Sequence, residues 1–278
     1  MRAWVAGIGF GLMLLPTVLA QQGTAAAALA PCVAGARPSF DVSSVKPSQT
    51  SSNSSSMRSR PDGLTATGAL KRLILNAYGL QDFQLSGGPD WVNTSTWEVA
   101  AKIDPPDTAP TKADMAAYDA WNERRMGRLQ SLLADRFALK CHMTAKELPV
   151  YELIIAKSGS KLKETTAEEG KRGSMNVNGD SRKNQMVATG VDLKTLAKTL
   201  AGDVGRSVID KTGLAGSYDL TLAWAADTMR AGQPADTDAA SGPTLFTAVE
   251  EQLGLKLVAA KGPVDVLVID GVEKPGEN

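Results

Sequence analysis

One histidine, two cysteines and scattered carboxylates are the side chains of this sequence that could do chemistry. His142 would have to act as the base in any mechanism that pairs a serine or cysteine nucleophile with a histidine. It follows Cys141 in a predicted strand, where adjacent side chains point to opposite faces. The two are therefore badly placed to form a nucleophile–base pair, and the sequence favours a structural or surface role for His142.

Two carboxylates that face each other across a cleft could hydrolyse a glycosidic bond. Glu250 and Glu251 are adjacent on a predicted helix, so their side chains diverge by about 100°. Asp210, Asp219 and Asp270 fall at strand ends or turns, where aspartate commonly accepts hydrogen bonds from nearby backbone donors. The pattern favours structural roles, and a hydrolase whose carboxylates are brought together by the fold remains an alternative.

Neither a metal site nor a phosphate loop is indicated. A zinc site needs about four histidine, cysteine or carboxylate ligands at suitable spacing, and one histidine with two distant cysteines supplies no such cluster. The Gly87-Gly88 pair is followed by Pro89, without the helix start and Lys-Ser/Thr of a nucleotide-binding loop. The sequence therefore assigns no catalytic residue, no metal ligand and no cofactor.

A few aromatic and charged residues are candidates for a binding surface. Trp91 lies in a Gly/Pro turn, and Tyr78 lies at the end of a predicted helix, so either could contact a ligand through an aromatic ring with a polar handle. Asp135 and Arg136, at the end of another helix, could form an ion pair or a recognition point. Two further tryptophans lie in alternating strands and are expected in the core: Trp97 and Trp224.

Residues 1–20 have the organisation of a secretory signal peptide. Arg2 supplies the charged start, residues 4–15 form a short apolar core, and residues 18–20 suit cleavage before Gln21. The apolar run is shorter than the roughly 20 residues of a membrane span. We expect export to the periplasm or the exterior, with a retained N-terminal anchor as the alternative, and residues 21–37 as a flexible leader.

The charges of the chain cancel, with 30 basic and 30 acidic residues. This balance disfavours nucleic acid and anionic membranes as partners. No long apolar stretch follows the signal, so no stable membrane insertion is expected after cleavage. Cys32, in the leader, and Cys141 could form a disulfide in an oxidising compartment, although their spacing alone does not establish one.

Apolar periodicity divides the remaining chain into four units, each leading from a helix into strands. Residues spaced i, i+3, i+4 and i+7 predict helical faces at 70–77, 126–133, 193–200 and 245–253. The first two units form a predicted half at residues 38–165, and the last two form another at 186–278. Residues 166–185 between them, rich in Gly, Lys, Glu, Ser and Asn, are predicted as an exposed loop.

A short cassette occurs twice in the sequence. Residues 138–140 lead to a Pro-Val segment at 149–155, and residues 254–256 lead to a similar one at 263–269. Internal repeats indicate architecture, so we predict an α+β fold of repeated helix–strand–strand units with mixed or antiparallel sheets. Two pseudo-symmetric halves are a further hypothesis. The strands predicted for the two cassettes are 139–143, 150–156, 255–260 and 264–270.

Several segments, in this order, resemble one family. They are residues 40–47, 76–79, 87–91, 132–137, 210–219, 246–252, 268–270 and 272–275. The family is a large group of exported proteins abundant in soil acidobacteria and described as a domain of unknown function, and the similarity covers roughly residues 38–278. Similar domains lie behind membrane metallopeptidases of the BlaR type, which implies an extracytoplasmic sensing or binding role. This chain has no zinc-protease motif and no multi-pass segment.

The sequence thus predicts an exported, non-enzymatic module that binds a protein, a peptide or an envelope component. Exposed strand edges could take up a partner by β-augmentation. Two alternatives stay open: an extracytoplasmic sensor component that works with a BlaR-type membrane protease, and a carboxylate-dependent hydrolase.

Overall fold

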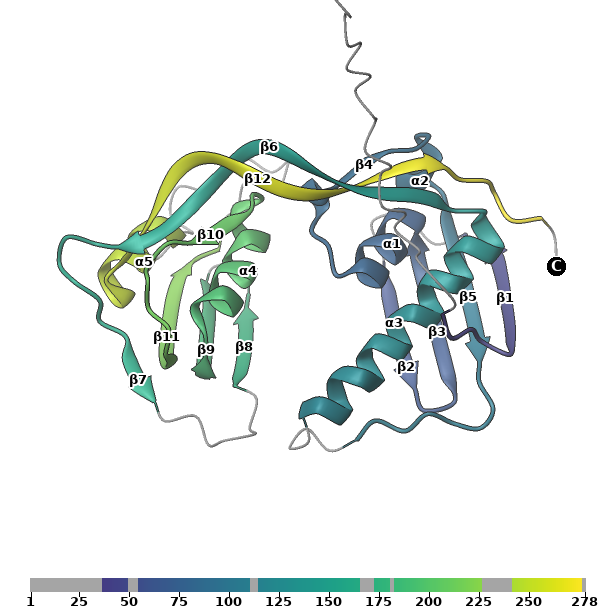
Figure 1. Cartoon of the computed structure of the whole chain (residues 1–278), viewed down its shortest axis with the longest axis horizontal. Helices are drawn as coiled ribbons and strands as arrows, with labels where there is room; N and C mark the ends of the chain where they lie inside the picture. The colour runs from purple at the N-terminus through teal and green to yellow at the C-terminus, as the bar shows by residue number, and fades with distance from the viewer. Residues whose placement is uncertain are drawn as a thin grey trace, which may run out of the picture.

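The computed structural model describes residues 37–49, 55–110, 115–165, 173–180, 183–226 and 242–276. The predicted signal peptide, the predicted leader up to residue 36 and Cys32 lie outside the described residues. Within them the protein has two lobes joined by a long two-stranded ribbon (Figure 1).

The first lobe is a four-stranded antiparallel sheet with helices packed on it. Its strand order is β1 (Val42–Pro47), β5 (Thr96–Lys102), β3 (Gly63–Ala69), β2 (Ser56–Arg60). The helices are α1 (Leu70–Tyr78), α2 (Trp91–Thr94) and α3 (Met115–Phe137).

The second lobe has a similar composition of elements. Its sheet is also antiparallel and runs β7 (Lys163–Thr165), β11 (Ser217–Ala225), β9 (Lys183–Val191), β8 (Ser174–Gly179). Its helices are α4 (Leu193–Val204) and α5 (Leu245–Leu253). The mixed α+β fold class predicted from the sequence is confirmed.

The ribbon consists of β6 (Lys140–Ile155) and β12 (Leu255–Gly271), which pair antiparallel along their whole lengths. Two short strands add to it in parallel: β10 (Val208–Asp210) beside β6, and β4 (Leu85–Gly87) beside β12. A single turn of 3-10 helix, η1 (Asp82–Gln84), precedes β4.

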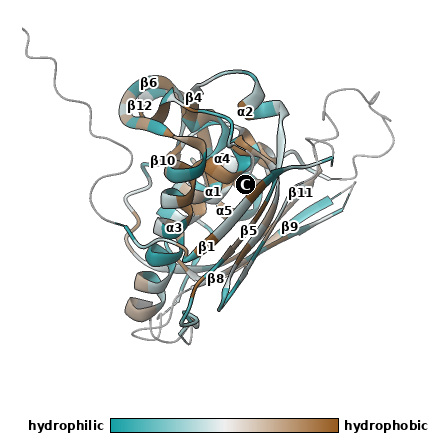
Figure 2. Cartoon of the chain, turned by 90° about the vertical axis from the view of Figure 1, so that its right-hand side faces the viewer, coloured by the Kyte–Doolittle hydropathy of each residue, from teal (hydrophilic) through white to brown (hydrophobic). Residues whose placement is uncertain are grey.

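Helix ends are set by short-range chemistry. Gly79 and Gly205 end α1 and α4 in the left-handed conformation, with φ of 63° at each, which glycine adopts without a side-chain clash. Asp192 and Thr244 cap the N-termini of α4 and α5 by accepting a hydrogen bond from the backbone N–H three residues on. In Figure 2 hydrophilic and hydrophobic residues lie side by side along these elements, as expected where one face is buried.

Each lobe has its own hydrophobic core. In the first lobe, Trp97 stacks edge-on against Phe137 at 5.4 Å and against Trp91 at 6.2 Å between ring centres. The second core is built mostly from leucine and alanine of α4, α5 and the sheet, around Met186 and Leu222. Trp97 and Trp224 are each 4% exposed, which confirms their predicted burial.

The ribbon corrects the predicted strand lengths. The sequence predicts two short strands in each cassette, whereas the structure has one continuous strand of 16 residues and one of 17. Each continuous strand contains a proline, Pro149 in β6 and Pro263 in β12, a residue that usually interrupts a central strand. Both lie where the ribbon has one neighbouring strand among the described elements, a position at which proline is tolerated.

The ribbon also crosses the predicted boundary between the halves. β6 starts in the first lobe and ends in the second, where Leu153 joins the second core; β12 runs back, so that Leu267 joins the first core. Residues 38–165 and 186–278 therefore each contribute one strand that spans both lobes, and β7, within the first range, belongs to the sheet of the second lobe. Within the predicted loop at 166–185 the structure has β8, an edge strand whose mostly polar side chains do not alternate as those of a half-buried strand do.

Candidate functional site

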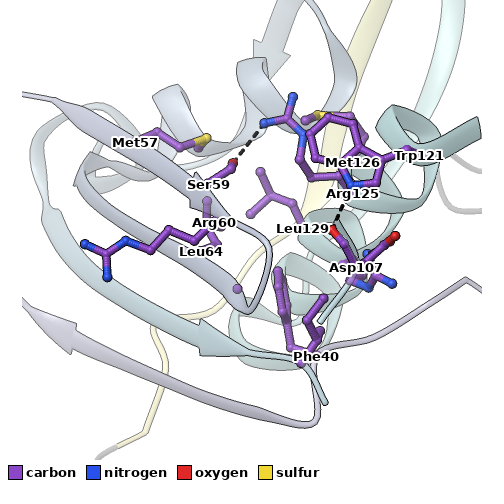
Figure 3. A pocket seen from close by; sticks show the side chains of 13 residues that line it. Phe40, Met57, Ser59, Arg60, Leu64, Asp107, Trp121, Arg125, Met126 and Leu129 are labelled. Carbon is purple, nitrogen blue, oxygen red and sulfur yellow. Dashed lines mark hydrogen bonds and ion pairs between the residues drawn. The ribbon is translucent and has the colours of Figure 1, made fainter. Parts of the chain in front are cut away.

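A small cavity in the first lobe lies between α3 and the sheet (Figure 3). Its free volume is about 20 Å³, which is room for about one water molecule. The cavity therefore belongs to the packing of α3 on the sheet and is too small for a ligand. The apolar side chains that line it include Phe40, Met57, Leu64, Met126 and Leu129.

Arg125 fills the polar side of this cavity. Its guanidinium donates to Ser59 Oγ at 2.8 Å and to Asn122 Oδ1 at 2.9 Å. It also lies 5.2 Å from the centre of the Trp121 ring, a cation–π geometry. Arg125 thus links α3 to β2.

Asp107 holds the segment after β5 against α3. Its carboxylate accepts hydrogen bonds from Arg124 Nη2 at 3.0 Å and from Arg128 Nη1 at 2.8 Å, while its backbone oxygen accepts one from Trp121 Nε1 at 3.0 Å. The hydrogen bond from Arg124, together with that from Arg128, holds the pKa of Asp107 below its usual value. This network orients α3.

A much larger hollow lies between the lobes, and we call it the interlobe cleft. α1 and residues 79–84 form its wall on the first lobe, and α4 forms the wall on the second. Its volume is about 620 Å³. An adjoining space of about 270 Å³ has Gly79, Gln81, Phe83 and Lys198 in common with it and reaches β10. Ligand sites commonly span about 300–1,000 Å³, so the interlobe cleft is of ligand size.

A fixed turn forms part of the first wall. The backbone N–H of Gln81 donates to Gln84 Oε1 at 3.1 Å, as one half of a reciprocal capping box. Gln84 Nε2 donates in turn to the backbone oxygen of Asp265 at 3.0 Å, which attaches the turn to β12. This wall is therefore held in place before any ligand arrives.

Small residues of α4 form part of the second wall. Ala197 and Ala201 line the cleft at the base of the helix, and Gly202 follows them. A Cβ atom on Gly202 would lie 3.6 Å from Gln81 Oε1, so the lobes approach closely there. The small side chains leave the space above them open.

The unbalanced charges of the interlobe cleft are positive. Lys194 and Lys198 are exposed on α4, and no carboxylate in the described residues lies within salt-bridge distance of either. Arg72, on the opposite wall, pairs with Asp82 at 3.3 Å. Asp210 is engaged locally, because its Oδ1 accepts hydrogen bonds from the backbone N–H and hydroxyl of Thr212.

Two of the residues nominated from the sequence pack against the first core. Tyr78 is partly buried, its hydroxyl oxygen lies 3.8 Å from Cys141 Sγ, and burial raises its pKa to about 12. Trp91 is half-buried against Trp97, with Lys274 Nζ 5.8 Å from its ring centre. Neither residue lines the cavity of Figure 3 or the interlobe cleft.

The two residues nominated at the end of α3, Asp135 and Arg136, have different surroundings. Asp135 is exposed, whereas Arg136 binds β1 by donating to the hydroxyl and the backbone oxygen of Ser43. The structure therefore does not bring Trp91, Tyr78, Asp135 and Arg136 together. Because Cys32 lies outside the described residues, its disulfide with Cys141 stays a prediction.

His142 has a partner that the sequence did not suggest. Its Nδ1 lies 2.9 Å from the carboxylate of Asp270 across the ribbon. Of the other two strand-end aspartates, Asp210 binds its own turn, as expected, and Asp219 accepts a hydrogen bond from the backbone N–H of Gly190 at 2.8 Å. These contacts agree with structural roles.

The residues of the interlobe cleft were missed by sequence reasoning. Lys194 and Lys198 are spaced i, i+4 on a helix, a pattern visible in the sequence but shared by many solvated helix faces. Gln81 and Arg72 are cleft residues only because they lie opposite α4, which is about 120 residues away in the chain. No local pattern carries that information.

Three comparisons complete the description. A family model for a protein of unknown function, DUF3738, matches residues 71–272. No curated protein and no solved structure matches the chain. Across the described residues, no helix is long and apolar enough to cross a membrane, and no three His, Cys, Asp or Glu side chains group as metal ligands would.

Proposed function

The chain belongs to the DUF3738 family of proteins of unknown function, and on this premise we propose that it is an exported, non-enzymatic binding module. Its binding site is the interlobe cleft. The ligand is a protein, peptide or envelope component that presents negative charge to α4.

The position of the cleft is the observation that carries this proposal. Each lobe packs around its own core, and the cleft lies between them with walls from both. A ligand there contacts α1 and residues 79–84 on one side and α4 on the other. Clefts between separately packed units are frequent ligand sites, because neither core has to open to admit the ligand.

Charge supports an anionic ligand. Lys194 and Lys198 line the cleft, and neither forms a salt bridge within the described residues, although the charge of Lys194 also acts on Asp192 at the start of α4. Uncompensated cations along a cleft attract anions and raise the rate of encounter. Leu80 and Phe83 add apolar surface, so a ligand with both carboxylate or phosphate groups and an apolar portion fits the site.

The carboxylates of the cleft support binding over hydrolysis. Asp82 is paired with Lys71 at 3.6 Å and Arg72 at 3.3 Å, and Asp210 is engaged by Thr212. An acid–base pair for glycoside hydrolysis requires two carboxyl groups that both face the substrate. A sensor role beside a BlaR-type membrane protease would be a narrower form of the same binding function.

A titration with defined probes tests this site. We expect a labelled hexaglutamate peptide or pyrophosphate to bind the full chain, and a hexaglutamine peptide to bind far more weakly. Lys198→Glu should weaken anion binding about tenfold, since it removes an attraction and adds a repulsion. Lys102→Glu, an equivalent charge change at an exposed position on β5, is the matched control.

Either of two results would contradict the proposal. One is equal binding of the neutral and acidic peptides, and the other is equal loss in the Lys198 and Lys102 variants. Export is tested separately by the mass of the protein recovered from the periplasm or medium, which should begin at or near Gln21.

A further inference from the structure

β8 is an edge strand of the second sheet, on the side that faces the first lobe (Figure 1). It pairs with β9 from Ser174 to Gly179. In the described part of the chain no strand pairs with its other side. That side presents a row of backbone donors and acceptors, which an extended chain can satisfy.

The other outer strands carry features that discourage pairing. Charged side chains, prolines and short length are the usual means by which proteins protect a sheet edge. β4 and β10 are three residues long, and the parts of β6 and β12 without an outer neighbour contain lysines and a proline each. The protecting residues on the remaining edges are Lys46 and Pro47 on β1, Arg58 and Arg60 on β2, and Lys163 and Glu164 on β7.

β8 has none of these features. Its sequence is Ser-Met-Asn-Val-Asn-Gly over residues 174–179, without charge or proline. Val177 lies opposite Met186, which is fully buried, yet Val177 itself is 45% exposed. The row of apolar side chains on the core face of the sheet therefore ends at Val177, which no side chain of the described residues covers. A further strand paired with β8 would place a side chain beside it.

We propose that β8 accepts an extended, uncharged segment of a partner protein as an additional strand, with an apolar residue beside Val177. The unpaired backbone requires an extended occupant, and the uncovered Val177 requires an apolar one. A whole second copy fits poorly, because the first lobe lies on the same side of β8 (Figure 1), whereas one added strand needs about 4.8 Å. This surface is distinct from the interlobe cleft and stands independently of it.

Selection from a phage library of random heptapeptides on the full chain tests the proposal. Enriched peptides should alternate apolar and polar residues, and deuterium exchange of the bound protein should slow at amides within residues 174–179. Val177→Lys should weaken a selected peptide about tenfold or more, because an edge lysine opposes pairing. Val187→Lys is the matched control, since Val187 is also 45% exposed but lies on the central strand β9.

Asn178→Lys provides a second edge variant, and a thermal melt shows that each variant is folded. The proposal is wrong if no peptide is enriched, or if selected peptides bind the Val177 and Val187 variants equally. Slowed exchange outside β8 would also overturn it. Self-association of the wild type that Val177→Lys abolishes would replace the partner segment with a second copy.

Discussion

The two lobes follow the same order of elements but are held together differently. In each, a strand leads into a helix, a short strand of the ribbon sheet, a second strand, a second helix and a long ribbon strand. The order is β3, α1, β4, β5, α3, β6 in one lobe, where η1 and α2 are additional, and β9, α4, β10, β11, α5, β12 in the other. The predicted pseudo-symmetry of the halves would account for this shared order.

The second helices of the two lobes, α3 and α5, are attached by different contacts. The long helix α3 is tied to the sheet by Arg125, to the segment after β5 by Asp107, and to β1 by Arg136. Gln252 attaches α5 to β11, because its side-chain amide exchanges two hydrogen bonds with the backbone of Ala223. α5, the corresponding helix of the second lobe, has 9 residues where α3 has 23. The second lobe also has the unprotected edge of β8. The two lobes thus share an order of elements, but the second lobe has a shorter second helix and an unprotected sheet edge.

Truncating the cores should have the largest effect and tests whether the lobes are independent. Phe137→Ala in the first lobe should lower the free energy of unfolding by about 3–5 kcal/mol, and Leu200→Ala in the second by about 2–5 kcal/mol, because each side chain is fully buried. Since both cores include residues of β6 and β12, calorimetry should show a single transition in both variants. Two separate transitions would show that the lobes unfold independently.

Loss of the predicted disulfide should have the next largest effect, confined to the first lobe where Cys141 is buried. Cys32→Ser should lower the free energy of unfolding by about 2–4 kcal/mol under oxidising conditions. Under reducing conditions the variant and the wild type should unfold alike. Peptide mapping without reductant should recover residues 32 and 141 in one linked fragment, and two free thiols would refute the pairing.

Asp107→Asn should loosen α3 and remove a pH dependence. We expect a loss of about 1–2 kcal/mol, because the partly buried Arg128 and the exposed Arg124 lose their shared carboxylate, and the pair with Arg128 contributes most. The folded pKa of Asp107 is lowered, so its contribution is complete above the unfolded pKa of about 4 and disappears as the pH falls through the folded pKa. Urea midpoints should therefore converge for the two proteins in acid; a constant gap would contradict this origin.

Asp192→Ala tests the second lobe with the smallest expected change. The Asp192 carboxylate caps α4 through the Thr195 N–H at 2.7 Å, so its loss should cost about 1 kcal/mol. Asp192→Asn should retain most of the stability, because the amide oxygen can accept the same hydrogen bond. Equal losses in both variants, measured by chemical denaturation, would indicate a charge effect instead of a cap.

Local patterns predicted the local structure well. The apolar spacing of α1 and α4 depends on residues within a few turns of one another, and the burial of Trp97 follows from the alternation of its own strand. The ribbon was predicted as four short strands, because its continuity depends on pairing residues 140–155 with residues 255–271, about 100 residues further along. The cleft was missed for the same reason, since Gln81 and Lys198 meet through that pairing.

Residue type alone was a poor guide to which side chains are available to a ligand, because it does not show which of them are buried. Trp91 and Tyr78 were selected as large side chains with polar handles, but both pack against the first core. Arg136 was selected as a charge at a helix end, but its guanidinium donates hydrogen bonds to Ser43 on β1. A side chain's availability to a ligand depends on which distant element covers it.

The ribbon has a consequence for the order of events during synthesis. Leu267 and Ile269 belong to the first core but lie on β12, about 130 residues further along the chain than Phe137 at the end of α3. The first core therefore stays incomplete until β12 has been synthesised, and β12 follows every other element of the second lobe. The lobe that is synthesised first is thus the one whose core has to wait for the last strand.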